Sequence, residues 1–329
     1  MYKTLFTLSL LASSVAAYAQ QANVSNTSDS TPSDIERVVV SGDFRQTTLD
    51  QLSASATILD QERLRSRQRS HIDSVLNSIP NVNFAAGASR GRFVQIRGIG
   101  ERSQFAEPIN PSVSFIVDEF DFSGLAAAGL IFDTKQLEVY RGPQATLYGT
   151  GALAGAVKLS SNDVGSDAPD YVEARIGNKE SYRIEGATGD DINTDWGYRV
   201  ALVHNRSDGF VENTFLNRSD TAKIDETALR FAVEGSVDER TTLALTYRWY
   251  DIDNGYDAFS LDNDNKTLSD EPGFDEHQTH AVSARSTTNT AAGDFILIAT
   301  HASHNIAYGY DEDWTFTGLH PWGYTSFDA

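Results

Sequence analysis

After residue 162 the chain alternates between apolar and polar residues in seven segments, most of them 7 to 11 residues long. In 241–251, for example, leucine and aromatic side chains at every second position oppose threonine, alanine and arginine. Alternation with a period of two predicts β-strands that have one apolar and one polar face. The predicted strands are residues 171–177, 181–189, 196–204, 226–236, 241–251, 278–287 and 294–304.

The connections between these predicted strands alternate in length. At one end of the predicted sheet the connections are long, at 205–225 and 252–277, apart from a short hairpin near 178–180. At the opposite end the connections are short turns, at 190–195, 237–240 and 288–293. Short turns at one end and long loops at the other are typical of outer-membrane β-barrels, whose apolar faces point to lipid. A soluble β-sandwich also has alternating faces, so alternation alone does not distinguish the two folds. The loop lengths and an export signal favour the membrane barrel.

The first half of the chain has a mixed pattern that predicts a compact α+β domain at residues 47–162. A capping box, Ser70-x-x-Asp73, precedes a short amphipathic helix that ends at Pro80. Strands are predicted at 82–85, 93–97, 113–118, 137–140 and 156–160. If 93–97 and 113–118 pair in antiparallel fashion, the loops 86–92 and 119–130 lie at the same end and form one surface.

The stretch 137–160, LEVYRGPQATLYGTGALAGAVKLS, organises this domain. It predicts a strand, a turn at Arg141-Gly142-Pro143, one apolar helical turn and a second strand. Glycines at 149, 151 and 155 fit backbone that passes close to other backbone or bends sharply. Tight passage inside a barrel explains them better than phosphate or ligand binding does.

The N-terminus has the features of an exported protein. Residues 1–19 contain Lys3, an apolar run and Ala17-Tyr18-Ala19 before a cleavage point, which is typical of a signal peptide. Residues 20–46 are a predominantly polar linker that we expect to be disordered up to its strand-like segment. That segment, 34–42, is rich in β-branched residues and suits pairing with the open edge of another protein's sheet; the alternative is an edge strand of the following domain.

Charge divides the chain into two halves. Residues 20–162 hold 13 Lys and Arg against 15 Asp and Glu, whereas residues 163–329 hold 12 against 31. Such an acidic surface excludes nucleic acid as a partner. The absence of cysteine excludes disulfides and cysteine metal sites.

Short motifs in fixed order make residues 34–329 similar to the TonB-dependent outer-membrane receptors. The motifs are IRGI at 96–99, FIVD at 115–118, LEVYRGPQ at 137–144, LYG at 147–149 and GALAG at 151–155. Glu119 departs from the family pattern, which usually has glycine after the aspartate, and leaves the form of that turn open.

The resemblance implies a membrane all-β fold, an antiparallel transmembrane β-barrel of about 22 strands with an N-terminal α+β plug domain in its lumen. About seven strands are expected here, and residues 322–329 show no terminal aromatic strand, so we expect an N-terminal fragment of a longer receptor. Its expected parts are the signal peptide 1–19, the linker 20–46 with a TonB box at 34–42, the plug 47–162 and the truncated barrel 163–329. The expected location is the outer membrane, in contact with its lipid, with the plug facing the periplasm and the long loops outside the cell.

The resemblance also implies site residues and a partner, TonB with its inner-membrane energy-transducing complex. The expected TonB-binding residues are Asp34, Ile35, Glu36, Arg37, Val38, Val39, Val40 and Ser41. Arg97 and Arg141 are expected to hold the plug to the barrel. The strand-direction argument places ligand-binding residues at the plug apices, namely Gly87, Ser89, Arg90, Arg92, Asp121, Phe122 and Ser123. Arg90 and Arg92 suit an anionic chelate; the alternative is that they pair with acidic barrel residues.

The expected function is import of a scarce ligand by a monomer, with a ferric siderophore or other iron complex as the commonest family substrate. The alternatives are cobalamin, an oligosaccharide, or a signal-transducing surface receptor. No nucleophile–base pattern indicates an enzyme, and we expect no cofactor. His277/His280 and His301/His304 fall on opposite strand faces, so no metal site is expected. The acidic loop 252–277 contains Asp262-Asn263-Asp264, as in a calcium loop, but lacks the glutamate that would complete it; a solvated acidic loop is favoured.

Overall fold

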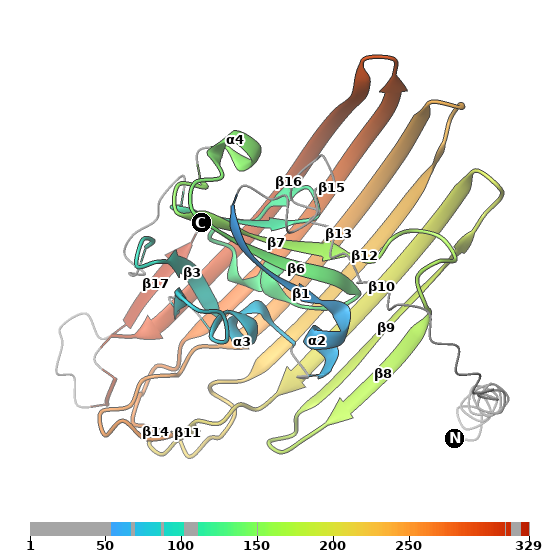
Figure 1. Cartoon of the computed structure of the whole chain (residues 1–329). Helices are drawn as coiled ribbons and strands as arrows, with labels where there is room; N and C mark the ends of the chain where they lie inside the picture. Colours follow the sequence, from blue (N-terminus) through green and yellow to red (C-terminus); the bar gives the residue numbers. More distant parts are fainter. Residues whose placement is uncertain are drawn as a thin grey trace, which may run out of the picture. The chain divides into compact units, whose positions relative to one another are not determined.

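The computed structural model describes residues 54–66, 70–86, 89–101, 111–149, 151–312, 314–316 and 324–328, all within one compact unit, Val38–Ala329. The predicted signal peptide and TonB box therefore lie outside the described residues. The described part contains a small mixed domain, which we call the plug, and an eight-stranded antiparallel sheet, which we call the barrel sheet (Figure 1). The inner face of the barrel sheet is the face that contacts the plug.

The plug is built around the predicted organising stretch. Its five-stranded sheet has the order β1-β6-β7-β4-β5, so β6 and β7 are central. Alternate residues of these strands, such as Leu137, Val139, Val157 and Leu159, are buried in the core. The elements are β1 (Ser55–Asp60), α2 (Gln61–Ser66), α3 (Ile72–Leu76), β2 (Val82–Ala86), β3 (Gly91–Ile96), β4 (Val113–Val117), β5 (Phe120–Asp121), the 3-10 helix η1 (Ala126–Gly129), β6 (Thr134–Arg141), α4 (Ala145–Tyr148) and β7 (Gly155–Ser161).

Two local predictions for the plug are wrong. The N-cap of α3 is His71 rather than Ser70, because the His71 ring accepts a hydrogen bond from the Asp73 backbone N–H. Strand β3 pairs with β2 in a hairpin of its own, while β4 pairs in parallel with β7. Because β2 and β3 are joined by a short connection, the backbone hydrogen bonds of β3 are made to β2. Strands β3 and β4 therefore do not form the predicted antiparallel pair.

Gly155 shows what the glycines of the organising stretch do. A Cβ at this position would lie 2.2 Å from the Tyr140 carbonyl oxygen and 2.6 Å from Ile96 Cδ1. Gly155 therefore passes close to other backbone, as expected, and that backbone is the neighbouring plug strand β6. Gly149 instead ends α4 with a φ of 79° and has open space around it.

We predict that Gly155→Ala destabilises the plug by more than the about 1–3 kcal/mol typical of overpacking, because backbone rather than a flexible side chain blocks the methyl group. Gly98→Ala is the matched control, since Gly98 has a φ of 80° but nothing within 4 Å of its added Cβ. The control should cost about 1 kcal/mol for backbone strain alone. Urea titration of plug protection from protease measures both variants, and equal midpoints would contradict the argument.

The barrel sheet has the order β17-β16-β15-β13-β12-β10-β9-β8. All seven predicted strands are confirmed, and several continue further toward the long loops. A further strand that the alternation does not predict, β17, pairs with β16 along Ala307–Asp311. The strands are β8 (Tyr171–Ile176), β9 (Tyr182–Asp191), β10 (Trp196–Ser207), β12 (Ile224–Ser236), β13 (Thr241–Gly255), β15 (Phe274–Thr290), β16 (Gly293–Asp311) and β17 (Tyr324–Asp328).

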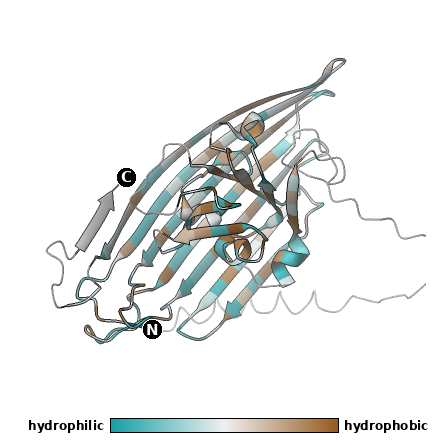
Figure 2. Cartoon of the chain, turned by 60° about the vertical axis from the view of Figure 1, so that its left-hand side comes forward, coloured by the Kyte–Doolittle hydropathy of each residue, from teal (hydrophilic) through white to brown (hydrophobic). Residues whose placement is uncertain are grey.

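Hydrophilic and hydrophobic residues are interspersed along the strands of the barrel sheet (Figure 2), and the two faces of the sheet differ in chemistry, as the alternation predicts. The face turned away from the plug exposes large apolar side chains, including Leu202, Phe231, Leu245 and Val282. The inner face carries buried polar residues between small ones, such as Arg230 between Ala228 and Ala232. A polar inside and an apolar outside are the arrangement of a membrane barrel. Among the described residues, no helix is both long enough and apolar enough to span a membrane.

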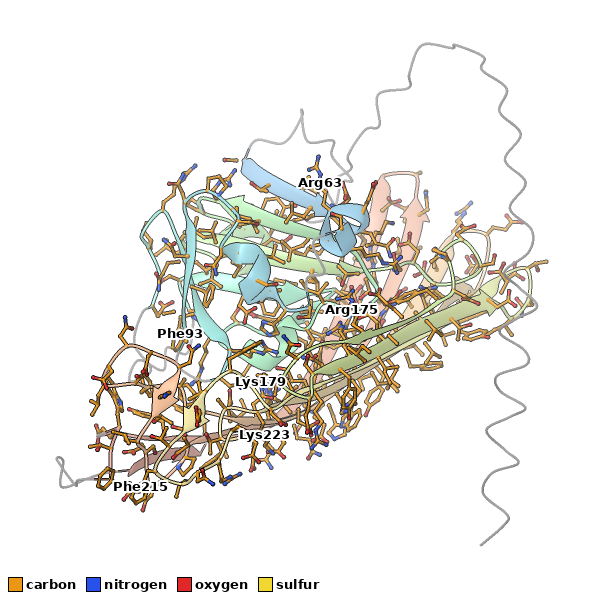
Figure 3. The ribbon with its side chains drawn as sticks, turned by 90° about the horizontal axis from the view of Figure 1, so that it is seen from below. Arg63, Phe93, Arg175, Lys179, Phe215 and Lys223 are labelled. Atoms are coloured by element: carbon orange, nitrogen blue, oxygen red, sulfur yellow. The ribbon has the colours of Figure 1, made fainter. Side chains whose placement is uncertain are left out.

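The two long loops pack on each other at one end of the sheet, where Figure 3 labels Phe215. Their short strands β11 (Glu212–Asn213) and β14 (Lys266–Thr267) pair in parallel. The buried Asn213 amide donates 2.9 Å hydrogen bonds to Asp257 Oδ2 and to the Ser269 carbonyl. The acidic loop is therefore not uniformly solvated, because Asp257 and Asp275 are buried while Asp262 and Asp264 stay exposed.

Candidate functional site at the plug and barrel interface

The plug loop that ends at β3 is attached to the barrel sheet. The Ser89 backbone N–H and hydroxyl donate to Asp275 Oδ2 over 2.8 and 2.6 Å. The Asn254 amide donates to the Ser89 hydroxyl over 2.9 Å. Gly87, the neighbouring predicted ligand residue, lies outside the described residues. Ser89 thus has barrel partners from both β13 and β15.

Arg90 forms a buried ion pair with the barrel sheet. Its Nε and Nη2 donate to the two Glu226 carboxylate oxygens over 2.6 and 2.7 Å. Burial lowers the pKa of Arg90, but the Glu226 carboxylate more than offsets this, so the guanidinium stays charged. Asp73 lies 3.7 Å from Arg90 Nη1. The alternative considered for Arg90, pairing with an acidic barrel residue, is the one the structure shows.

Asp73 extends this ion pair to helix α3. Burial raises the pKa of Asp73, whereas His71 and Arg90 lower it, and the net result is a pKa of about 2. A carboxylate with a depressed pKa adds stability above its ordinary value of 3.8 and loses it as the pH falls toward 2. The loop, the helix and the barrel sheet are therefore joined by charge at neutral pH.

The other predicted apex loop, 119–130, packs against the barrel sheet through Phe122. Phe122 is fully buried, with its ring 5.6 Å from the Phe120 ring and 5.9 Å from the Tyr250 ring. The prediction that Phe122 faces a ligand is therefore wrong; the apolar ring instead completes the contact between the plug and β13. Asp121 is exposed and accepts hydrogen bonds from the Ser123 backbone and hydroxyl.

Arg92 connects the two predicted apex loops. Its Nε donates to the Gly124 carbonyl over 3.0 Å, and its guanidinium carbon lies 5.3 Å from the centre of the Tyr308 ring. The loops meet as expected although the strand pairing that suggested it is wrong. The guanidinium has a carbonyl and an aromatic face as partners, so it is not an unoccupied anion site.

Arg97 and Arg141 do not make the expected plug–barrel contacts in the described structure. Arg97 is exposed with a φ of 55°. Arg141 donates to Ser55 Oγ over 3.2 Å and to Thr57 Oγ1 over 2.8 Å, which joins β6 to β1 inside the plug. Other residues hold the plug: Arg90 pairs with the barrel carboxylate Glu226, and two plug carboxylates pair with barrel arginines.

Asp133 of the plug is enclosed by barrel arginines. Arg199 Nε lies 2.8 Å from Asp133 Oδ2 and Arg199 Nη2 lies 2.6 Å from Oδ1, and neither side chain is exposed. Arg230 adds a contact of 3.3 Å to Oδ2. The Asn162 amide donates to Oδ1 over 2.8 Å. This bidentate, fully desolvated pair is a strong attachment between plug and barrel sheet.

Asp118 is the second plug carboxylate in this cluster. Arg248 Nη2 donates to Asp118 Oδ2 over 2.5 Å, and Arg230 Nε lies 3.8 Å from the same oxygen. Burial raises the pKa of Asp118, but Arg248 and Arg230 more than offset it, so the pKa lies well below the ordinary value. Its contribution to plug seating is thus complete above about pH 4 and is lost only at strongly acid pH.

The turn at Asp118 explains the departure from the family motif. Asp118 and Glu119 form the two-residue turn between β4 and β5, and the positive φ, 53°, falls on Asp118. Glu119 does not need the left-handed conformation, so glycine is not required there. The Glu119 carboxylate accepts a 3.0 Å hydrogen bond from Ser283 and lies 3.5 Å from Arg285. The substitution adds a plug–barrel contact.

A polar cavity of about 410 Å³ separates the plug from the barrel sheet beside this cluster. Asp118, Glu119 and Asn162 line it from the plug side, and Arg230, Glu234 and Arg285 line it from the barrel. Its barrel residues on β12, β13 and β15 lie between the arginine cluster and the short turns. The cluster therefore closes the cavity on the side of the long loops.

The histidines form a pair that sequence spacing does not reveal. His277 on β15 and His304 on β16 share the inner face, with Thr279 Oγ1 2.6 Å from His277 Nε2 and 2.9 Å from His304 Nδ1. The Thr279 hydroxyl thus bridges the two rings. Within the described ranges, no group of three or more His, Asp or Glu side chains is placed to hold a metal ion.

The alternation predicts these arginines on polar strand faces, but no sequence pattern connects them to the plug. The available signal was one arginine on the polar face of each of three successive strands, Arg199, Arg230 and Arg248. Their partners, Asp118 and Asp133, follow or precede plug strands and have positive φ values of 53° and 46°. Such aspartates read as ordinary turn residues in the sequence.

Comparisons with known proteins agree with this architecture. A family model described as TonB-dependent Receptor Plug Domain matches residues 48–156. The chain is 25% identical over 186 residues to the pesticin receptor of Yersinia pestis, covering 55% of this chain and 27% of that receptor. It is 22% identical over 240 residues to the vitamin B12 transporter BtuB of Vibrio vulnificus, covering 68% of this chain and 36% of the transporter.

A solved structure shares the arrangement of plug and barrel sheet. The ferric yersiniabactin uptake receptor FyuA from Yersinia pestis superposes with a TM-score of 0.68 at 18% identity, over 78% of this chain and 42% of that chain. The chain thus covers less than half the length of each of these three proteins. Residues 48–156 thus belong to the TonB-dependent receptor plug domain family, and the chain with its apolar-outside barrel sheet is similar to TonB-dependent outer-membrane receptors.

Proposed function

We propose that the protein imports a scarce ligand across the outer membrane in a TonB-dependent manner, and that the ligand is a ferric siderophore or another iron complex. The observation that carries the proposal is the seating of the plug by Asp118, Asp133 and Arg90 on buried barrel partners. Breaking a buried ion pair costs about 3–5 kcal/mol, so a passage for a large ligand opens only when work is done on the plug.

The energy for that work comes from another compartment in this proposal. The outer membrane has no ATP and no ion gradient of its own, so the inner-membrane complex must act through a protein that reaches the plug. We propose that Asp34–Ser41 adds as a strand to TonB, because main-chain pairing needs little specific side-chain chemistry. The residues that join this segment to β1, 42–54, set how far it can reach from the plug.

The barrel sheet supports a role as one side of a closed pore. Neither of its edge strands, β8 and β17, pairs with the other. An open sheet edge inside a lipid bilayer would leave backbone N–H and C=O groups without partners, which costs several kcal/mol each. We therefore propose that further strands close the barrel around the plug and that the closed receptor acts as a monomer.

The ligands of similar proteins favour an iron complex over other ligands. The structure that superposes is a ferric yersiniabactin uptake receptor, whereas the vitamin B12 transporter favours cobalamin as the second candidate. All three are receptors or transporters, and none is an enzyme. An oligosaccharide importer and a signal-transducing receptor remain the weaker alternatives.

Transcription of the gene under nutrient limitation tests the cargo. We expect the transcript to rise when iron is removed from the medium and to return to its starting level when iron is restored. Cobalamin depletion and growth on oligosaccharides are the parallel conditions. Induction by cobalamin depletion would favour the second candidate, and induction by a sugar with no response to iron would overturn the iron proposal.

A further inference from the structure

The inner face of the barrel sheet carries three neighbouring arginines, Arg199, Arg230 and Arg248, which we call the arginine strip. Arg230 on β12 is directly opposite Arg248 on β13. Arg199 on β10 is opposite Ala232, two residues along β12 from Arg230. The three guanidinium groups therefore lie side by side across three consecutive strands at one level of the sheet.

The plug supplies every carboxylate that the strip contacts in the described structure. Those carboxylates are Asp118 and Asp133. Two acids of the barrel sheet lie nearby but do not pair with the strip. Glu185 pairs with Arg183 instead. Glu234 lies beyond Ala232 along β12 and lines the cavity. Removing the plug would thus leave three adjacent cations facing an aqueous space without carboxylate partners from the wall.

Neutralisation of the strip is incomplete even with the plug in place. Three guanidinium groups share two carboxylates, and the buried Nε atoms of Arg230 and Arg248 make no hydrogen bond. Both side chains are more than nine-tenths buried. A buried donor without a partner costs about 1–3 kcal/mol, which an additional oxyanion oxygen would relieve.

The strip lies on the route between the two ends of the sheet. Arg230 lines the 410 Å³ cavity, whose other barrel residues lie toward the short turns. On the opposite side, Arg90 is already occupied by Glu226 and Asp73. The strip, rather than the plug apex, is therefore the cationic surface that movement of the plug makes available.

We propose that the arginine strip is an anion-recognising lining of the import passage, and that the ligand crosses it as an anion with carboxylate or similar oxyanion groups. The proposal rests on the import function above and specifies the class of ligand. Oxyanion groups of the ligand take the places of Asp118 and Asp133 as the plug yields. Guanidinium groups bind carboxylates in bidentate geometry, which favours this exchange. Because the ligand replaces the lost carboxylates, the exchange lowers the free energy needed to move Asp118 and Asp133 away from the strip.

Ion selectivity of the opened receptor tests the proposal without knowledge of the ligand. The complete receptor is placed in a planar lipid bilayer, urea is added to displace the plug, and the chloride-to-potassium permeability ratio is measured in a KCl gradient. We expect chloride to be preferred about threefold or more, because a wall lined by one sign of charge concentrates the counter-ion. Replacing Arg199, Arg230 and Arg248 together by glutamine should bring the ratio to about one or below.

Three control variants separate charge from structure. Lysine at the same three positions keeps the charge and should keep the anion preference. Arg206→Gln removes an exposed arginine on the outward face of β10 and should leave the ratio unchanged. Asp118→Asn with Asp133→Asn leaves the strip intact and should keep the ratio while lowering the urea concentration that opens the pore.

A cation-selective or unselective wild-type pore would overturn the proposal, as would an anion preference that survives the triple glutamine change. Failure of urea to open any conductance would contradict the claim that the plug covers a continuous passage. These outcomes leave TonB-dependent import untouched, since no TonB or ligand is present in the bilayer. Conversely, a finding that the receptor does not import a ligand with TonB would not change the ion selectivity measured in the bilayer.

Discussion

Val38→Pro is expected to abolish ligand uptake while leaving ligand binding at the cell surface unchanged. Proline removes the backbone N–H and fixes φ, so a strand that pairs with TonB through its main chain loses a ladder hydrogen bond. A cost of about 3 kcal/mol would reduce pairing roughly a hundredfold. The same result is expected for Val39→Pro, because neighbouring residues of an edge strand share the ladder.

Substitutions that keep the N–H provide the control. Val38→Thr changes the side chain but retains both the donor and the β-propensity, so uptake should persist. Uptake of radiolabelled iron complex by intact cells measures transport, and retention of the same complex by de-energised cells measures binding. Normal uptake by both proline variants would refute the assignment of Asp34–Ser41 as the TonB-binding segment.

Asp133→Asn is expected to have the largest effect on plug seating. The change keeps the size of the side chain but removes the charge that Arg199 and Arg230 share inside a fully buried site. Leaving a buried charge uncompensated costs about 3–5 kcal/mol. The urea midpoint for protease cleavage of the plug in the purified receptor should therefore fall well below the wild-type value.

Asp163→Asn is the matched control, because its partner Lys135 is exposed and so is Asp163 itself. A surface pair contributes about 0–1 kcal/mol, so the midpoint should barely move. A shift for Asp133→Asn no larger than that of the control would show that the barrel arginines do not hold the plug. Barrel assembly, followed by the resistance of the receptor to heating in detergent, should be retained in both variants.

Strand existence and strand face were predictable from sequence because alternation fixes which residues share a face. The polar faces of 196–204, 226–236 and 241–251 already contained Arg199, Arg230 and Arg248. What opposes them was not predictable, because it depends on how the plug is placed against the sheet. Arg90 and Glu226, for example, are 136 residues apart in the chain, and no local pattern connects them.

The wrong predictions have different causes. His71 rather than Ser70 caps α3, since a ring nitrogen can accept the backbone hydrogen bond as well as a hydroxyl can. The position of Phe122 in a loop predicts a ligand surface, but Tyr250 and His304 of the barrel sheet pack against its ring. The first error lies in a local contact between residues two apart, and the second in a contact that tertiary packing supplies.

The position of β1 determines how a mechanical load would travel through the plug. Strand β1 is at the edge of the plug sheet and is held by a single ladder of pairs, from Ser55–Arg141 to Asp60–Gln136, reinforced by the Arg141 side chain. Tension applied ahead of Ser55 therefore breaks that ladder first, while Asp118 and Asp133 remain bound. The β1–β6 ladder and the ion pairs of the arginine strip would then be broken one after the other, so each step requires a smaller force than breaking both together.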